Sequence, residues 1–125
     1  MSAYSQDQVP IEFEADVAQT RAIDEGGMTI AFERISAGVE TAPLYKGLPG
    51  DACQSPHWGY VISGRIRVLS ADGNEESIGA GQAYYLAPGH NVVVDEDVMV
   101  VEFSPAHERA RTMEHAAQVM QGAGA

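Results

Sequence analysis

The chain has 125 residues, of which 45% are hydrophobic; this suits one globular domain and argues against two domains or disorder along its whole length. Seven basic residues against eighteen acidic ones give a net charge of −11, so nucleic acids and anionic membranes are excluded as expected partners. The single cysteine excludes an internal disulfide, and no apolar run reaches the length of a membrane span. The N-terminus shows no basic and apolar leader, so we expect a cytoplasmic protein.

The first part of the chain predicts an arm, a strand and a long loop. Residues 1–10 are polar and are expected to form a loose arm, while residues 11–22 fit either an edge strand or a short turn of helix. After a glycine pair, residues 28–35 predict a strand because apolar side chains alternate along it at period two. Prolines exclude most of residues 40–56 from a central strand. A loop of this length in a compact domain is more often functional than idle.

Two histidines stand at the ends of predicted strands, each beside a proline. His57 opens the β-branched and aromatic run 57–64, and His90 closes the run 81–90 that follows about thirty residues later. This placement predicts one pocket built by two strands. Further short strands are expected at 65–69, after which Asp-Gly predicts a hairpin turn, and at 92–94 and 98–103, joined by a turn through 95–97.

The C-terminal segment predicts a helix over residues 105–120. Ser104 is a suitable N-cap, and the missing N–H of Pro105 is tolerated at the first helical position. The apolar stripe expected to face the domain or a second subunit consists of Ala106, Ala110, Met113, Ala117 and Met120. Seven or eight short strands with one terminal amphipathic helix predict an all-β barrel or sandwich, forming a single domain over residues 1–125.

Residues 28–103 resemble the cupin family, whose fold is a small, jelly-roll-like double-stranded β-helix barrel. The first cupin motif contains His-x-His, then a glutamate and a closing glycine; with Gly64 as that glycine, His57 takes the glutamate position, and Asp51 and Cys53 take the histidine pair. The second motif has Gly, Pro-x-Gly, His and Asn. There His90 lies two residues before the expected position, a shift that keeps a strand side chain on the same face.

A second alignment of the first motif is open. Residues 41–46 can take the His-x-His strand, with Leu44 and Lys46 in place of the histidines and 47–56 as an inserted loop that carries Cys53. Either alignment keeps Cys53, His57 and His90 as ligands. Asp51 is a ligand only in the first.

The resemblance implies a divalent metal, Zn²⁺ or Fe²⁺, held by Cys53, His57, His90 and Asp51, because thiolate and imidazole donors suit these ions. With Asp51 the site is a closed tetrahedral structural site; without it, one position is free for water or substrate. Tyr60 and Tyr85 are the candidate catalytic tyrosines, able to act as acid or hydrogen-bond donor.

Two functions follow from these residues. The first is a metal-dependent enzyme that isomerises, cyclises, decarboxylates or dioxygenates a small organic molecule. The second is a non-catalytic barrel that binds or senses a small ligand, with a structural metal or none. The resemblance also implies a homodimer.

Overall fold

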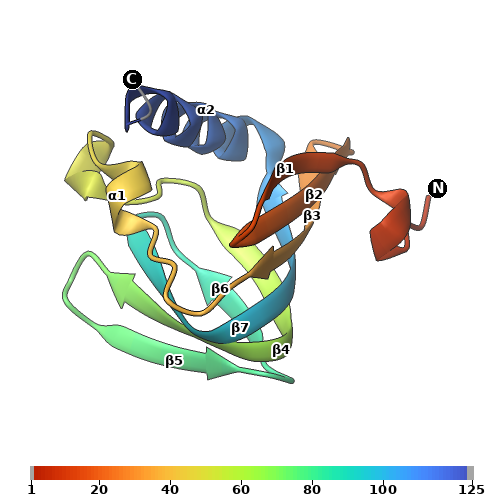
Figure 1. The fold of residues 1–125 in the computed structure, drawn as a ribbon, viewed down its shortest axis with the longest axis horizontal. Helices are drawn as coiled ribbons and strands as arrows, with labels where there is room; N and C mark the ends of the chain where they lie inside the picture. The colour runs from red at the N-terminus through yellow and green to blue at the C-terminus, as the bar shows by residue number, and fades with distance from the viewer. Residues whose placement is uncertain (1, 124–125) are drawn as a thin grey trace.

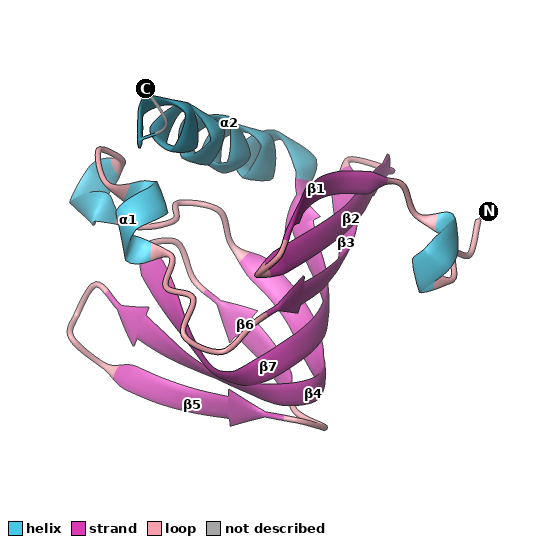
Figure 2. Ribbon diagram, in the orientation of Figure 1, coloured by secondary structure: helices cyan, strands magenta, loops and turns pink. Residues whose placement is uncertain are grey.

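One antiparallel seven-stranded sheet curves around the interior of the protein, and helices lie across one of its ends (Figures 1 and 2). The structure is a computed structural model and describes residues 2–123. The strands are β1 Ile11–Ala15, β2 Ala18–Glu25, β3 Met28–Ile35, β4 His57–Ser70, β5 Glu75–Gly79, β6 Ala83–Leu86 and β7 His90–Pro105. The helices are the 3₁₀ turns η1 Gln6–Gln8 and η2 Pro49–Asp51, the short α1 Ala42–Tyr45 and the terminal α2 Ala106–Ala123. The predicted all-β fold with a C-terminal helix is confirmed.

The strand order is β1-β2-β3-β7-β4-β5, with β6 paired to the first residues of β4. The stretch 11–22, whose sequence fits both strand and helix, forms most of the β1–β2 hairpin. The sheet runs from Ile11 to Pro105 and so extends beyond both ends of the predicted barrel, residues 28–103. Within the expected arm, residues 6–8 form η1 and the side chain of Val9 is fully buried.

The two long strands β4 and β7 bend without breaking, which corrects the expected separate strands and the turn at 95–97. Their pairing shifts register between Val61 and Ile66, and Gly64 within this irregular stretch has φ +87°. Bulges of this kind sharpen the twist of a sheet and bend it. One bent strand, β4, therefore takes the place of the predicted strands 57–64 and 65–69, and β7 takes the place of 92–94 and 98–103. The bends let the sheet curve around its core.

The interior contains two apolar clusters. The larger fills the barrel and comprises Val61, Ile66, Val68, Ile78, Tyr84, Leu86, Val94, Val98 and Val100. The smaller lies where α1 and α2 pack together at the open end and comprises Tyr45, Cys53 and Ala116, with Leu44 and Leu48 beside them. Of the helices within residues 2–123, none has the length and hydropathy to cross a bilayer.

The face that α2 turns inward differs from the predicted apolar stripe. Arg109, Thr112 and Ala116 are buried, whereas Ala110 and Met120 are exposed. These buried positions are spaced by three and four residues and share one helical face. The helix covers the polar end of the barrel, so polar side chains on this face find partners there.

Candidate metal centre

The structure brings Cys53, His57 and His90 together at the end of the barrel that α2 covers. One donor atom from each lies within 4.8 Å of the other two, and all three residues are buried. His57 and His90 are the first residues of β4 and β7. Cys53 reaches them from the loop because its backbone pairs with that of His90, donating from N to the His90 carbonyl over 2.9 Å. The two imidazole rings meet edge to face, with centroids 5.1 Å apart.

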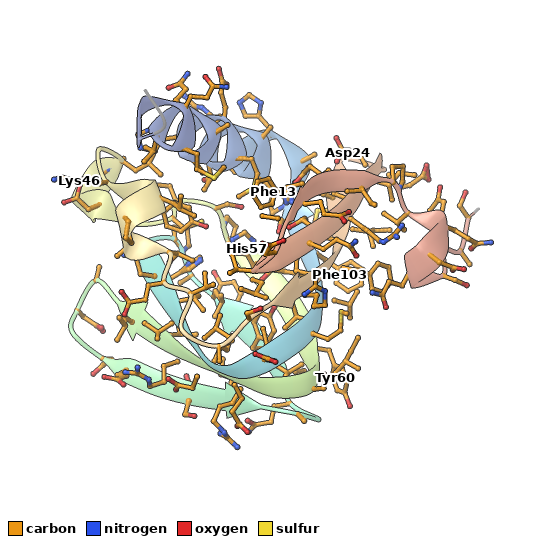
Figure 3. The ribbon with its side chains drawn as sticks, in the orientation of Figure 1. Phe13, Asp24, Lys46, His57, Tyr60 and Phe103 are labelled. Atoms are coloured by element: carbon orange, nitrogen blue, oxygen red, sulfur yellow. The ribbon has the colours of Figure 1, made fainter. Side chains whose placement is uncertain are left out.

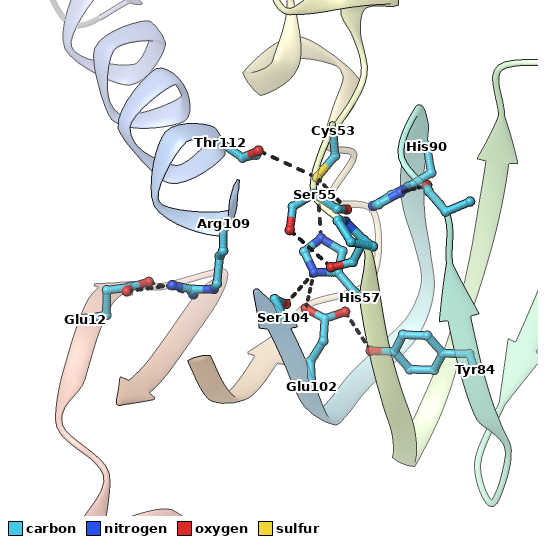
Figure 4. Close-up of polar contacts among 12 residues, drawn as sticks. Glu12, Cys53, Ser55, His57, Tyr84, His90, Glu102, Ser104, Arg109 and Thr112 are labelled. Carbon is cyan, nitrogen blue, oxygen red and sulfur yellow. Dashed lines mark hydrogen bonds and ion pairs between the residues drawn. The ribbon is translucent and has the colours of Figure 1, made fainter. Parts of the chain in front are cut away.

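Both histidines have one ring nitrogen engaged away from the centre. Nδ1 of His90 lies 2.6 Å from the carbonyl oxygen of Ala87, which only accepts, so this nitrogen donates and Nε2 keeps its lone pair. Nδ1 of His57 lies 2.6 Å from Oγ of Ser104 and 3.8 Å from a carboxylate oxygen of Glu102. Protein metal sites commonly hold a ligating histidine in this way, through its other nitrogen. The arrangement leaves Nε2 of His57 toward Sγ of Cys53 (Figure 4).

One pair of the donor atoms has the spacing of two zinc ligands. Sγ of Cys53 lies 3.4 Å from Nε2 of His57. Zn–S and Zn–N bonds of about 2.3 and 2.0–2.1 Å at a tetrahedral angle separate the two ligand atoms by about 3.5 Å. Burial lowers the pKa of each histidine to about 4, so both imidazoles are neutral at pH 7, the form that binds metal. Burial also raises the pKa of the Cys53 thiol, and a bound cation opposes that effect by favouring the thiolate.

Asp51 does not belong to this group. Its side chain is exposed and Oδ1 accepts a hydrogen bond from the backbone N–H of Gly47 over 2.9 Å, which ties the loop to itself. The alternative alignment through residues 41–46 is also wrong, because Ala42–Tyr45 is helical and contributes no strand. Proline at the start of that segment favours a helix N-terminus.

A cavity of about 90 Å³ adjoins the two histidines. Its lining is largely apolar side chains of the barrel core, together with the polar side chains Glu33, Tyr84, Glu102 and Arg109. The hydroxyl of Tyr84 donates to Oε1 of Glu102 over 2.8 Å. Glu102 therefore connects Tyr84 to the far side of the His57 ring.

The sequence led to no expectation for Glu33, Glu102 and Arg109, and Tyr60 and Tyr85 were preferred to Tyr84, although alternation along the strands favours Glu102 and Tyr84. Glu102 shares a period-two face with the buried Val98 and Val100, and Tyr84 shares one with Leu86. A carboxylate on the inward face of a strand is rare unless it is paired. Its place on this inward face could therefore have marked Glu102 as a paired, buried carboxylate.

Tyr60 and Tyr85, the candidate catalytic tyrosines, do not line this cavity, and Tyr85 lines a second pocket together with His90. They are 45% and 55% exposed, and in β6 the inward positions belong to Tyr84 and Leu86 (Figure 3 shows Tyr60 pointing outward and His57 inward). Tyr84 fits inside because it faces Gly59 across the strands: a Cβ on Gly59 would come 2.4 Å from Cζ of Tyr84.

Burial, followed by the charge of Glu102, raises the pKa of Glu33 to about 8. Between the ordinary value of 4.5 and about 8, the unfolded chain loses this proton and the folded protein keeps it, so stability falls as pH rises. We expect Glu33→Gln to gain about 1–3 kcal/mol over the wild type between pH 5 and 9, with the gain levelling off above pH 8. Urea unfolding of chelator-treated protein at each pH measures this difference. Glu76→Gln, an exposed glutamate on β5, should follow the wild type; a gain for Glu33→Gln that does not vary with pH would contradict the protonated assignment.

Proteins of known structure share the fold of this chain. No family model matches the chain, and no curated protein matches its sequence. Ectoine synthase from P. lautus is 17% identical with a TM-score of 0.61, over 84% of this chain and 78% of that one. The polyketide cyclase RemF from Streptomyces resistomycificus is 17% identical with a TM-score of 0.61, over 84% and 79%. An RmlC-like cupin from Shewanella frigidimarina NCIMB 400 is 17% identical with a TM-score of 0.57, over 82% and 88%. At this identity the likeness concerns the fold, and the chain has the cupin fold.

Proposed function

We propose that this protein binds one divalent metal ion, Zn²⁺ or Fe²⁺, through Cys53, His57 and His90 and acts on a small organic molecule in the adjoining cavity. The convergence of three buried donor atoms beside a cavity carries the proposal. Three protein ligands leave a fourth position for water or substrate, as in catalytic zinc sites. When bound, such a metal polarises a carbonyl or activates water or oxygen.

The chain's own groups have definite tasks in this proposal. Glu102 and Ser104 orient His57 through its Nδ1. Tyr84 lines the cavity, and because its proton is donated to Glu102, its hydroxyl oxygen can accept a hydrogen bond from a polar group of the substrate. The apolar inner wall holds the rest of the substrate and excludes water.

A cyclase and a synthase are among the proteins with this fold, which supports an enzyme. The reactions that we propose for it are isomerisation, cyclisation, decarboxylation or dioxygenation. Elemental analysis of protein purified without added metal or chelator tests the proposal. Near-stoichiometric zinc or iron supports it. Absence of metal, with none taken up on reconstitution, would leave a metal-free ligand-binding barrel.

We further propose that the protein is a homodimer, joined through the outer face of β6, β4, β7 and β3. Two cross-strand rows on this face are apolar: Tyr85, Trp58, Phe103 and Ile30 form one, and Ala83, Tyr60, Val101 and Phe32 form the other. Trp58, Tyr60, Tyr85 and Phe103 are between 40% and 55% exposed. Two copies that each carry a charge of −11 repel, and this face lets them meet without opposing carboxylates.

We expect Tyr60→Glu to convert a dimer into a monomer of 13.3 kDa, because symmetry places two added carboxylates in one apolar interface. Light scattering after gel filtration measures the mass. Trp58 is the chain's one tryptophan, so its emission should also shift to the red on dilution of the wild type. Met120→Glu, an exposed apolar position on α2, is the matched control and should stay dimeric; a monomeric wild type would end the proposal.

A further inference from the structure

A buried cation that lines the cavity is held by a carboxylate from the sheet edge. Arg109 on α2 lines the cavity, and its side chain is only 7% exposed. Its two terminal nitrogens donate to the two carboxylate oxygens of Glu12 on β1, over 2.9 and 2.8 Å (Figure 4). This is the bidentate geometry by which arginine binds carboxylates in general.

Glu12 is placed on Arg109 by an irregularity in an edge strand. Ile11 pairs with Arg21 and Phe13 with Thr20, so Glu12 is an extra residue in β1. Such bulges re-aim a side chain. All five residues of β1 are exposed and the Glu12 side chain is 38% exposed, so this carboxylate can leave Arg109 into water without unfolding the core.

The face of α2 that carries Arg109 also contacts the candidate metal centre. Thr112, one turn further along the helix, lies 3.9 Å from Sγ of Cys53 through its hydroxyl oxygen. Arg109 and the histidines line the same cavity. A ligand in this cavity therefore lies beside both the candidate metal ligands and Arg109.

The other acidic groups near Arg109 do not take its hydrogen bonds. Glu33 and Glu102 lie near enough to affect the pKa of Arg109, but neither is hydrogen-bonded to it, and burial raises the pKa of Glu33 to about 8. Glu102 is bonded to Tyr84. Within residues 2–123, Glu12 is the carboxylate that is hydrogen-bonded to Arg109.

We propose that Arg109 is the carboxylate-binding residue of the cavity and that Glu12 occupies it until a small monocarboxylate displaces it. This inference rests on the proposed function of the cavity and names its ligand class. The cavity of about 90 Å³ is small, so the ligand class is a small acid such as acetate or propionate.

The test compares acetate and propionate with the neutral isosteres acetamide and propionamide, by calorimetry on the protein as purified. The wild type should favour the acids. Glu12→Gln removes the resident competitor: if the pair is formed in about nine-tenths of molecules, the acids should bind about tenfold tighter, with the amides unchanged. Glu14→Gln on the same exposed strand is the matched control and should match the wild type.

Arg109→Gln should abolish the preference for acids over amides. Because this variant removes a buried cation and can lose stability, the gain in Glu12→Gln is the decisive result, since misfolding does not tighten binding. An unchanged acid affinity in Glu12→Gln would leave the Glu12–Arg109 pair as a structural link only. Metal content measured in the same samples separates the two proposals: full metal with no acid preference overturns this inference alone, and absent metal overturns the proposed function.

Discussion

Cys53→Ser and His90→Gln are each expected to bind Zn²⁺ at least about 100-fold more weakly than the wild type. Loss of a residue that only orients a ligand weakens metal binding about 10–100-fold, so loss of a ligand itself should exceed that range. Each variant removes one of the three converging donor atoms. Competition against a chromogenic chelator of known affinity, at fixed pH, measures the dissociation constants.

Two further variants test whether the loss of Zn²⁺ affinity is specific to the proposed ligands. Asp51→Asn alters an exposed residue that caps its own loop, so Zn²⁺ affinity should stay at the wild-type value. Glu102→Gln retains the shape of the side chain but removes the carboxylate beside His57. It should bind Zn²⁺ about 10–100-fold more weakly than the wild type, which is a smaller loss than in Cys53→Ser and a larger one than in Asp51→Asn. Equal losses in Asp51→Asn and Cys53→Ser would show that the metal lies elsewhere.

Gly64→Ala is expected to lower the free energy of unfolding by about 3–5 kcal/mol. Gly64 has φ +87°, and a Cβ there would lie 2.0 Å from the backbone oxygen of Asp97 on β7. Backbone cannot rotate out of the way as a side chain can, so the β4–β7 bend must open. Urea unfolding of chelator-treated protein measures the loss.

Gly73→Ala separates the two causes of that loss. Gly73 has nearly the same dihedral, φ +86°, but the position that a Cβ would take there has no neighbouring atom within 4 Å, so only the dihedral penalty of about 1–2 kcal/mol remains. The difference between the two variants is the cost of the close approach to Asp97. Equal losses would mean that the bend accommodates a methyl group and that the conformation alone requires glycine.

The sequence did not predict which of the two adjacent tyrosines of β6 faces the interior. Tyr84 and Tyr85 are adjacent and have the same chemistry, so composition cannot distinguish them; only the pairing of β6 with β4 decides that Tyr84 faces inward. A shift of register by one residue would exchange their faces. The absence of a side chain at Gly59 then gives the Tyr84 ring its place.

The sequence also did not predict which face of α2 is buried. An apolar stripe is the right expectation for a helix packed on an apolar core. Here α2 covers a polar barrel mouth instead, and its inward face carries Arg109 and Thr112 because Glu12 and Cys53 are there to receive them. What a helix covers is a property of the assembled fold and is not encoded in the periodicity of the helix alone.

The sequence by itself determined the all-β architecture and the terminal helix, because alternation and the positions of glycine and proline are local properties. The resemblance to the cupin motifs pointed to Cys53, His57 and His90, together with Asp51. The tertiary structure decided what those residues face. Long-range pairing turned Glu33, Glu102 and Tyr84 inward, left Asp51 in solvent, and closed Glu12 on Arg109 across 97 positions of the chain. Such contacts depend on register and curvature summed over many residues, so no local pattern specifies them.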